Sequence, residues 1–199
     1  MDARKDRLIE LLLLHAFQYR TEPPFVLASG ATSPYYINCK AVTLRAEGLN
    51  LIGGLGYEAV SELGVAAVGG LTLGADPMAC AIAMHSYGRS RRLSAFVVRK
   101  EAKGHGMARW LEGEVPAGTR VVIVEDVATT GASALLAIER AREAGLIVED
   151  ALLLVDREEG ASEAIEAAGV RVRSILTRSE LVARRQQALR HAAEAAALV

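Results

Sequence analysis

The residues with the clearest chemical potential lie in the stretch VVIVEDVATTGAS, Val121 to Ser133. Four aliphatic residues lead directly into two adjacent carboxylates, Glu125 and Asp126, and a turn of small and hydroxylated residues follows. Carboxylates accept hydrogen bonds from hydroxyl groups or bind hydrated cations, so they suit the diol of a sugar. Backbone N–H groups at the start of a helix, with threonine and serine hydroxyls, suit a phosphate dianion. A ribose 5-phosphate would satisfy both halves of the stretch.

Two common phosphate-binding motifs are absent from this stretch. It lacks the Gly-Lys-Ser/Thr ending of a Walker P-loop, which disfavours cleavage of a nucleoside triphosphate. It also lacks the GxGxxG pattern of dinucleotide-binding folds. From the residue types alone, an acidic pair on the surface followed by an ordinary helix N-cap remains an alternative interpretation.

A second group of chemically active side chains lies in RKEAKGHG, Arg99 to Gly106. Residues 99–109 hold four lysines and arginines against one acid, in a chain whose totals are 23 basic and 24 acidic residues. Glycines would let this segment close over a pyrophosphate and exclude water, although a solvated charged loop is the alternative. Arg157 follows a predicted strand, where its planar guanidinium could grip a carboxylate. Such an arginine is more often a surface charge.

The rest of the chain predicts the elements that place these groups. Apolar runs typical of strands alternate with helical patterns, which indicates an α/β fold with a central parallel β-sheet flanked by helices. Binding sites in such sheets lie beyond the carboxyl ends of the strands. The expected strands are 65–69, 93–99, 120–125, 147–156 and 170–176, and the expected helices are an N-terminal one capped near Asp2, then 47–63, 77–88, 132–144, 160–168 and 179–199.

Composition predicts one domain of ordinary size with two appendages. Residues 1–45 combine the first helix with a proline-containing subdomain of loops and short strands, 46–178 form the core, and 179–199 form a C-terminal helix packed on the core. A formal charge of −1 argues against nucleic acid as a partner. No apolar run approaches the ~18 residues of a membrane span. Cys39 and Cys80 have no zinc-site spacing, so we expect a reducing compartment, the cytoplasm.

The stretch from Val121 to Ser133 resembles the signature for phosphoribosyl pyrophosphate (PRPP) of the type I phosphoribosyltransferases. In that family the acids hold the ribose hydroxyls and the following loop holds the 5-phosphate. The resemblance therefore implies the type I phosphoribosyltransferase fold. It also implies that PRPP is bound by Glu125, Asp126, Val127, Ala128, Thr129, Thr130, Gly131, Ala132 and Ser133.

The segment RKEAKGHG, with LEG after it, resembles the flexible catalytic loop of the orotate phosphoribosyltransferases. The resemblance implies that Arg99, Lys100, Lys103 and His105 bind PRPP, and that Arg99, Lys103 and His105 are catalytic. Lys103 would take the main electrostatic role, and His105 could donate a proton to the leaving group. The resemblance also implies a homodimer in which residues 99–113 are shared across the subunits.

Two more segments resemble the same family at the end of the site that holds the base. FVLASGATSPYYIN, Phe25 to Asn38, resembles the N-terminal hood over the orotate ring, and LVDREEGA resembles the segment whose arginine clamps orotate. The hood departs from the pattern at Ala28, where many members have lysine. The orotate-binding residues implied by the resemblance are Ser29, Tyr35, Tyr36, Thr129 and Arg157.

GLTLGADPMA, residues 70–79, resembles the pyrophosphate loop of the family. Gly74 stands in this segment in place of a lysine that several members carry. Phosphoribosyltransferases often have a non-proline cis peptide bond here, and we expect one at Thr72–Leu73.

Together the segments imply transfer of a 5-phosphoribosyl group from PRPP to orotate, which yields orotidine 5′-monophosphate and pyrophosphate in pyrimidine biosynthesis. The implied cofactor is Mg²⁺, held mainly through PRPP and water, with no protein metal ligand. A purine phosphoribosyltransferase would share the acidic pair without the basic loop. A PRPP-binding regulator would keep the fold without turnover, although Lys103 and His105 argue against it.

Overall fold

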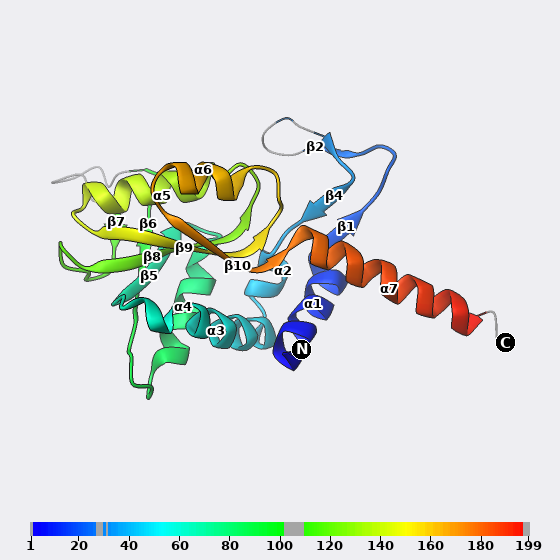
Figure 1. The fold of residues 1–199 in the computed structure, drawn as a ribbon, viewed down its shortest axis with the longest axis horizontal. Coiled ribbons are helices and arrows are strands. Elements are labelled where there is room, and N and C mark those ends of the chain that lie inside the picture. The colour runs from blue at the N-terminus through cyan, green and yellow to red at the C-terminus, as the bar shows by residue number, and fades with distance from the viewer. Residues whose placement is uncertain (1, 27–29, 31, 102–109, 197–199) are drawn as a thin grey trace.

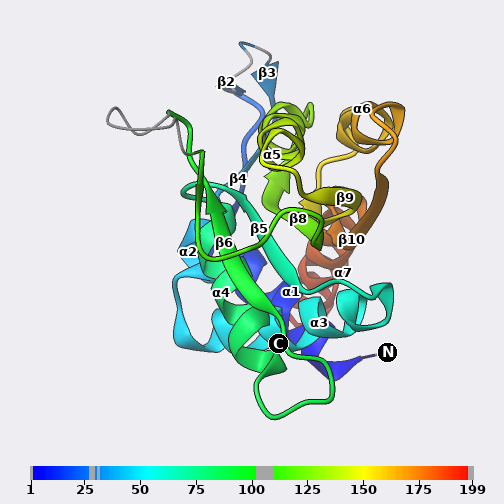
Figure 2. The ribbon, with the colours of Figure 1, turned by 90° about the vertical axis from the view of Figure 1, so that its left-hand side faces the viewer.

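A six-stranded sheet forms the centre of the computed structural model, which describes residues 2–26, 30, 32–101 and 110–196 (Figures 1 and 2). The strand order is β10-β9-β8-β5-β6-β7. Neighbouring strands are parallel except for β7, which pairs antiparallel with β6. The predicted α/β fold is confirmed. The strand bounds are β5 Ala67–Leu71, β6 Ser94–Val98, β7 Leu111–Glu112, β8 Arg120–Ala128, β9 Ile147–Asp156 and β10 Arg171–Thr177.

Helices cover both faces of this sheet, and the strand sequences show why. Side chains alternate between the two faces of a strand, so an apolar run supplies both sides of a sheet at once. In β8, Val122 and Val124 pack on the side of α3 (Ala46–Val60) and α4 (Ala75–Ser86). Val121 and Ile123 pack on the side of α5 (Ala132–Glu143) and α6 (Ala161–Ala167). Figure 1 shows the sheet between these two helical layers.

The N-terminal part adds a helix and two small hairpins. Helix α1 (Ala3–His15) begins at Asp2, whose Oδ1 accepts a hydrogen bond from the Arg4 backbone N–H at 2.9 Å, as the predicted cap requires. Strand β1 (Phe17–Tyr19) pairs with β4 (Tyr35–Ile37), and β2 (Phe25–Val26) pairs with β3 (Thr32–Ser33). The short helix α2 (Lys40–Thr43) follows and leads to α3. These strands and α2, with the residues that connect them, are called the hood below.

Helix α7 (Arg178–Ala196) ends the described chain and extends away from the sheet (Figure 1). It contacts α1 and β10 near its start, where Leu181 is fully buried, whereas Leu189 is 54% exposed. Alanine, arginine and glutamine dominate this helix, which favours helix formation but gives little apolar surface to bury. The division of the chain at residues 45 and 178 stays a prediction.

Two element bounds differ from the predicted ones, and one specific prediction about the backbone is confirmed. Strand β8 continues three residues beyond the predicted end, because its pairing with β9 persists to Ala128. Helix α4 begins at Ala75, two residues before Pro77. The peptide bond between Thr72 and Leu73 is cis, as predicted. Within the described residues, no helix is both long and apolar enough to cross a membrane.

Candidate active site

The acidic pair lies within the last four residues of β8, a central strand of the sheet. Glu125 is 6% exposed and Asp126 is 3% exposed. Within the described part of the chain, Glu125 Oε2 and Asp126 Oδ2 are buried without a hydrogen-bond partner. Buried polar atoms are nearly always paired, so two unpaired carboxylate oxygens indicate a place where a ligand donates hydrogen bonds. The surface-pair alternative is wrong, because both side chains are buried.

Burial also changes the pKa of Glu125. The pKa of Glu125 is raised from 4.5 to about 8, chiefly by desolvation and then by the charge of Asp126. Close packing of two carboxylates therefore favours a protonated Glu125 near neutral pH while no ligand is present. Hydroxyl donors from a sugar would stabilise the ionised form.

Gly74 contacts the acidic pair at the start of α4. A Cβ atom at this position would collide with the carboxylate of Asp126, so the missing side chain leaves room for that group. The backbone of Gly74 is helical, with φ −61° and ψ −41°, so the requirement is for space. Gly74 is thus coupled to the position of Asp126.

Two residues of the hood lie beside the same pair, and the sequence did not indicate a role for either. Lys40 Nζ is 3.9 Å from Asp126 Oδ2. The thiol of Cys39 is fully buried, and burial together with the charge of Asp126 raises its pKa well above the usual value. These contacts bring the hood and the core strand together at one place.

The turn after the acids leads into α5 as predicted. Gly131 adopts a left-handed conformation, with φ +79°, and precedes the first helical residue, Ala132. No side chain caps this helix at Gly131, so its first N–H groups are suited to an anion. Thr130 and Ser133 are exposed beside them. The end of β8 is fixed by a hydrogen bond from the backbone N–H of Arg157 to the Ala128 carbonyl, at 3.0 Å.

Arg157 connects this turn to the hood. Its guanidinium is 4% exposed, and Nη2 donates to Ser33 Oγ at 3.2 Å and to the Tyr35 carbonyl at 3.4 Å. The same nitrogen is 3.0 Å from Glu159 Oε1, which also pairs with Arg178 Nη1 at 3.2 Å. Nε of Arg157 has no partner among the described residues. Arg178 Nε also lies 3.9 Å from Glu158 Oε2, so the two arginines are paired with two glutamates. The unpaired Nε of Arg157 is the part of this group that could donate to an anionic base.

The paired tyrosines of the hood point to different aromatic neighbours. Tyr35 packs against Phe17 and Tyr19, with ring centroids 5.6 and 5.2 Å away. Tyr36 stacks on Phe25 at 5.5 Å with an interplanar angle of 26°. Their predicted contact with the base stays a prediction. Thr129 is half-buried at the turn, whereas Ser29 lies outside the described residues.

The basic loop is described at its two ends. Lys103 and His105 lie outside the described residues, so their predicted roles stay predictions. The backbone N–H of Arg99 donates to the Trp110 carbonyl at 2.8 Å, and Arg99 Nε is 2.9 Å from Glu112 Oε1. Lys100 is exposed beside it. These contacts close the base of the loop.

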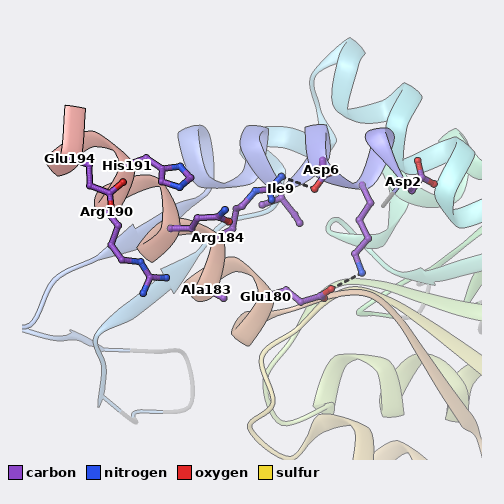
Figure 3. Close-up of a pocket in the computed structure, with 11 residues that line it drawn as sticks. Asp2, Asp6, Ile9, Glu180, Ala183, Arg184, Arg190, His191 and Glu194 are labelled. Carbon is purple, nitrogen blue, oxygen red and sulfur yellow. Dashed lines mark hydrogen bonds and ion pairs between the residues drawn. The ribbon is translucent and has the colours of Figure 1, made fainter. Parts of the chain in front are cut away.

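A separate cavity of about 740 Å³ lies between α1 and α7, away from the acidic pair (Figure 3). Much of its charge is paired internally, since Lys5 Nζ is 2.7 Å from Glu180 Oε1 and Arg184 Nη2 is 2.6 Å from Asp6 Oδ1. We assign no ligand to this cavity.

Comparison with known proteins identifies the family. The orotate phosphoribosyltransferase of Aquifex aeolicus (strain VF5) is 47% identical over 178 residues, which cover 89% of this chain and 97% of the relative. The chain belongs to the orotate phosphoribosyltransferase family. No family model matched the chain in a separate scan. The 249 matching curated proteins include the Synechocystis orotate phosphoribosyltransferase, which is 46% identical over 85% of this chain and 84% of its own length.

Solved structures of the same family share the fold. An orotate phosphoribosyltransferase of Mycobacterium tuberculosis H37Rv, in complex with PRPP, is 39% identical with a TM-score of 0.74. The alignment covers 89% of this chain and 98% of that one. The central sheet, its helical layers and the acidic strand therefore belong to the type I phosphoribosyltransferase fold.

Proposed function

We propose that this chain transfers the 5-phosphoribosyl group of PRPP to orotate, yielding orotidine 5′-monophosphate and pyrophosphate in pyrimidine nucleotide biosynthesis. The observation that carries this proposal is the buried acidic pair, with one unpaired oxygen on each side chain, directly before an uncapped helix N-terminus. Membership in the orotate phosphoribosyltransferase family supports orotate as the base. The guanidinium of Arg157, whose Nε has no partner among the described residues, fits the carboxylate of orotate.

The residues divide the work by the part of the substrate that they face. Glu125 and Asp126 would accept hydrogen bonds from the ribose hydroxyls, and their negative charge would favour the cationic ribose that forms as pyrophosphate leaves. The turn from Ala128 to Ser133 would hold the 5-phosphate. Arg157 would clamp the orotate carboxylate. Orotate is already anionic, so it needs orientation more than a general base.

Departure of pyrophosphate needs positive charge at the other end of the substrate. We propose that Arg99, Lys100, Lys103 and His105 supply it when the loop closes, with Lys103 in the main role. Closure would also exclude water from the cationic ribose. We further propose a cytoplasmic homodimer that shares residues 99–113 across its subunits. The free thiols of Cys39 and Cys80 fit a reducing compartment.

We propose Mg²⁺ as the cofactor. Within the described residues, no group of three or more His, Cys, Asp or Glu side chains could hold a metal ion, so the ion would take most of its ligands from PRPP and water. The unpaired oxygen atoms of the acidic pair are hard donors that suit such a hydrated complex. Bound there, Mg²⁺ would neutralise charge on the pyrophosphate.

The loss of orotate absorbance on addition of PRPP and Mg²⁺ tests the proposed function. We expect turnover with orotate, and no release of pyrophosphate when adenine, guanine or hypoxanthine takes its place. Turnover with a purine instead of orotate would show that the base substrate is a purine. Binding of PRPP without turnover of any base would make the chain a PRPP-binding regulator. Arg157→Ala should raise the KM for orotate more than the KM for PRPP, and an unchanged KM for orotate would reject the clamp.

A further inference from the structure

Lys40 is the one described cation that forms an ion pair with either acid of the site. Its Nζ lies 3.9 Å from Asp126 Oδ2, too far for a direct hydrogen bond, and its side chain is 43% exposed. Lys40 makes no second ion pair with another described residue. The ammonium group is therefore next to the buried pair and partly exposed to solvent.

The position of Lys40 is fixed by the fold of the hood. It is the first residue of α2, directly after the fully buried Cys39. Val42, two residues after Lys40, is also fully buried and anchors α2 in the core. Gly74 leaves space for the carboxylate of Asp126, because a Cβ atom there would collide with it. The position of the Asp126 side chain thus depends both on Lys40 and on the glycine at the start of α4.

The charge of Lys40 next to the acidic pair affects how the site binds an anionic ligand. A phosphoribosyl ligand is strongly anionic, and two buried carboxylates repel it unless positive charge lies close by. Lys40 favours the ionised form of Glu125, since its charge lowers the pKa that burial raises. An ionised pair is the better acceptor for sugar hydroxyls.

We propose that Lys40 is a positioning residue that orients Asp126 toward the ribose and offsets the charge of the acidic pair during phosphoribosyl binding. This proposal rests on the proposed function only in that the acids bind ribose. It assigns to the hood a role at the sugar, in addition to its predicted role over the base. It also places a positive charge near the sugar.

Calorimetric titration with ribose 5-phosphate and, separately, with inorganic pyrophosphate in Mg²⁺ tests the proposal. We expect Lys40→Met to weaken ribose 5-phosphate binding by about threefold to tenfold, the range for a partly exposed pair with a buried acid. Pyrophosphate binding should change by less than about twofold, because Lys40 acts through Asp126. Lys40→Arg, which keeps the charge, should recover most of the affinity.

Lys5→Met is the matched control, because Lys5 is similarly exposed (36%) and pairs with Glu180 on the far α1–α7 side. It should leave both affinities unchanged. Unchanged ribose 5-phosphate affinity in Lys40→Met, equal weakening of pyrophosphate, or failure of Lys40→Arg to recover would each overturn the proposal. Wild-type protein that binds ribose 5-phosphate but does not consume orotate would reject the proposed function and still allow this comparison.

Discussion

The raised pKa of Glu125 predicts how the stability of the ligand-free protein depends on pH. The folded chain holds a proton on Glu125 up to about pH 8, whereas the unfolded chain releases it near its usual value of 4.5. This contribution to stability is full below about pH 4.5 and is lost as the pH rises through about 8. The free energy of unfolding should therefore fall by on the order of a few kcal/mol across that window.

Glu125→Gln provides the control, because it cannot ionise and keeps nearly the same volume. Urea unfolding at several pH values should show a smaller decline for this variant between about pH 5 and pH 8. Parallel pH profiles for the two proteins would show that Glu125 keeps an ordinary pKa.

Gly74→Ala should weaken PRPP binding with little effect on folding. The backbone of Gly74 is helical, so alanine fits its conformation, but the added Cβ would displace the carboxylate of Asp126. We expect the KM for PRPP to rise by about tenfold, which corresponds to roughly one lost hydrogen bond. Steady-state kinetics with varied PRPP would measure it.

Gly54→Ala is the comparison for that variant. Gly54 lies in α3, where a Cβ would meet the nearest atom of His85 at 3.4 Å, an ordinary contact. Its KM for PRPP should match the wild type. If the KM of Gly74→Ala for PRPP also matches the wild type, the position of the Asp126 carboxylate does not depend on the space that Gly74 leaves.

At the scale of elements, the succession of the central strands and helices along the chain could be predicted because most of the strands are short apolar runs, whereas the two-residue strand β7 was not predicted. The side chains of β8 alternate between the two faces of the sheet, and both sets are buried. An apolar run of this kind is therefore typical of a central strand covered by helices on both faces. The end of β8 was misplaced because acids are uncommon in strands, and pairing with β9 overrides that preference here. The short hood strands carry too few residues for any periodic signal.

The site could be predicted where its residues are neighbours in sequence. The acids and the phosphate turn form one continuous stretch, so their proximity followed from local structure. Ser33 and Arg157 are 124 residues apart, and Lys40 and Asp126 also meet only through packing of the hood on the core. Nothing in their local sequence indicates these contacts, because they depend on how α2 and β3 pack in three dimensions.

Helix α5 connects the phosphate turn to the end of the basic loop. The guanidinium carbon of Arg140 lies 3.7 Å from the centre of the Trp110 ring, and Trp110 is the first described residue on the C-terminal side of the loop 99–113. Such a cation–π contact contributes about 0.5–1 kcal/mol at a partly exposed site. We expect Arg140→Met to reduce kcat by about twofold to fivefold, because the base of the loop loses its anchor.

Fluorescence gives an independent measure of that contact, since Trp110 is the single tryptophan of the chain. Its emission should shift in Arg140→Met, and the melting temperature should fall by a few degrees at most. Arg142→Met, on the same helix, is the control and should leave the emission unchanged. An unaltered emission and kcat in Arg140→Met would mean that the anchor does not act in solution.

At the scale of the whole molecule, a shared loop would make each active site depend on two subunits. Lys103→Ala removes the main proposed charge of the loop, and Asp126→Asn removes an acceptor for the ribose. Each variant alone should have a kcat lower by orders of magnitude. The two changes lie in different parts of the chain, so a mixed dimer can combine the intact part of each subunit.

Unfolding and refolding an equal mixture of these two variants should restore activity. Half of the dimers would be mixed, and one of the two sites in each would pair an intact loop with an intact acidic pair, giving about a quarter of wild-type activity. A loop that acts within its own subunit leaves both sites of the mixed dimer defective, so the mixture would be no more active than the separate variants. Sedimentation of the refolded mixture would confirm that dimers are present, so that an inactive mixture counts against the shared loop.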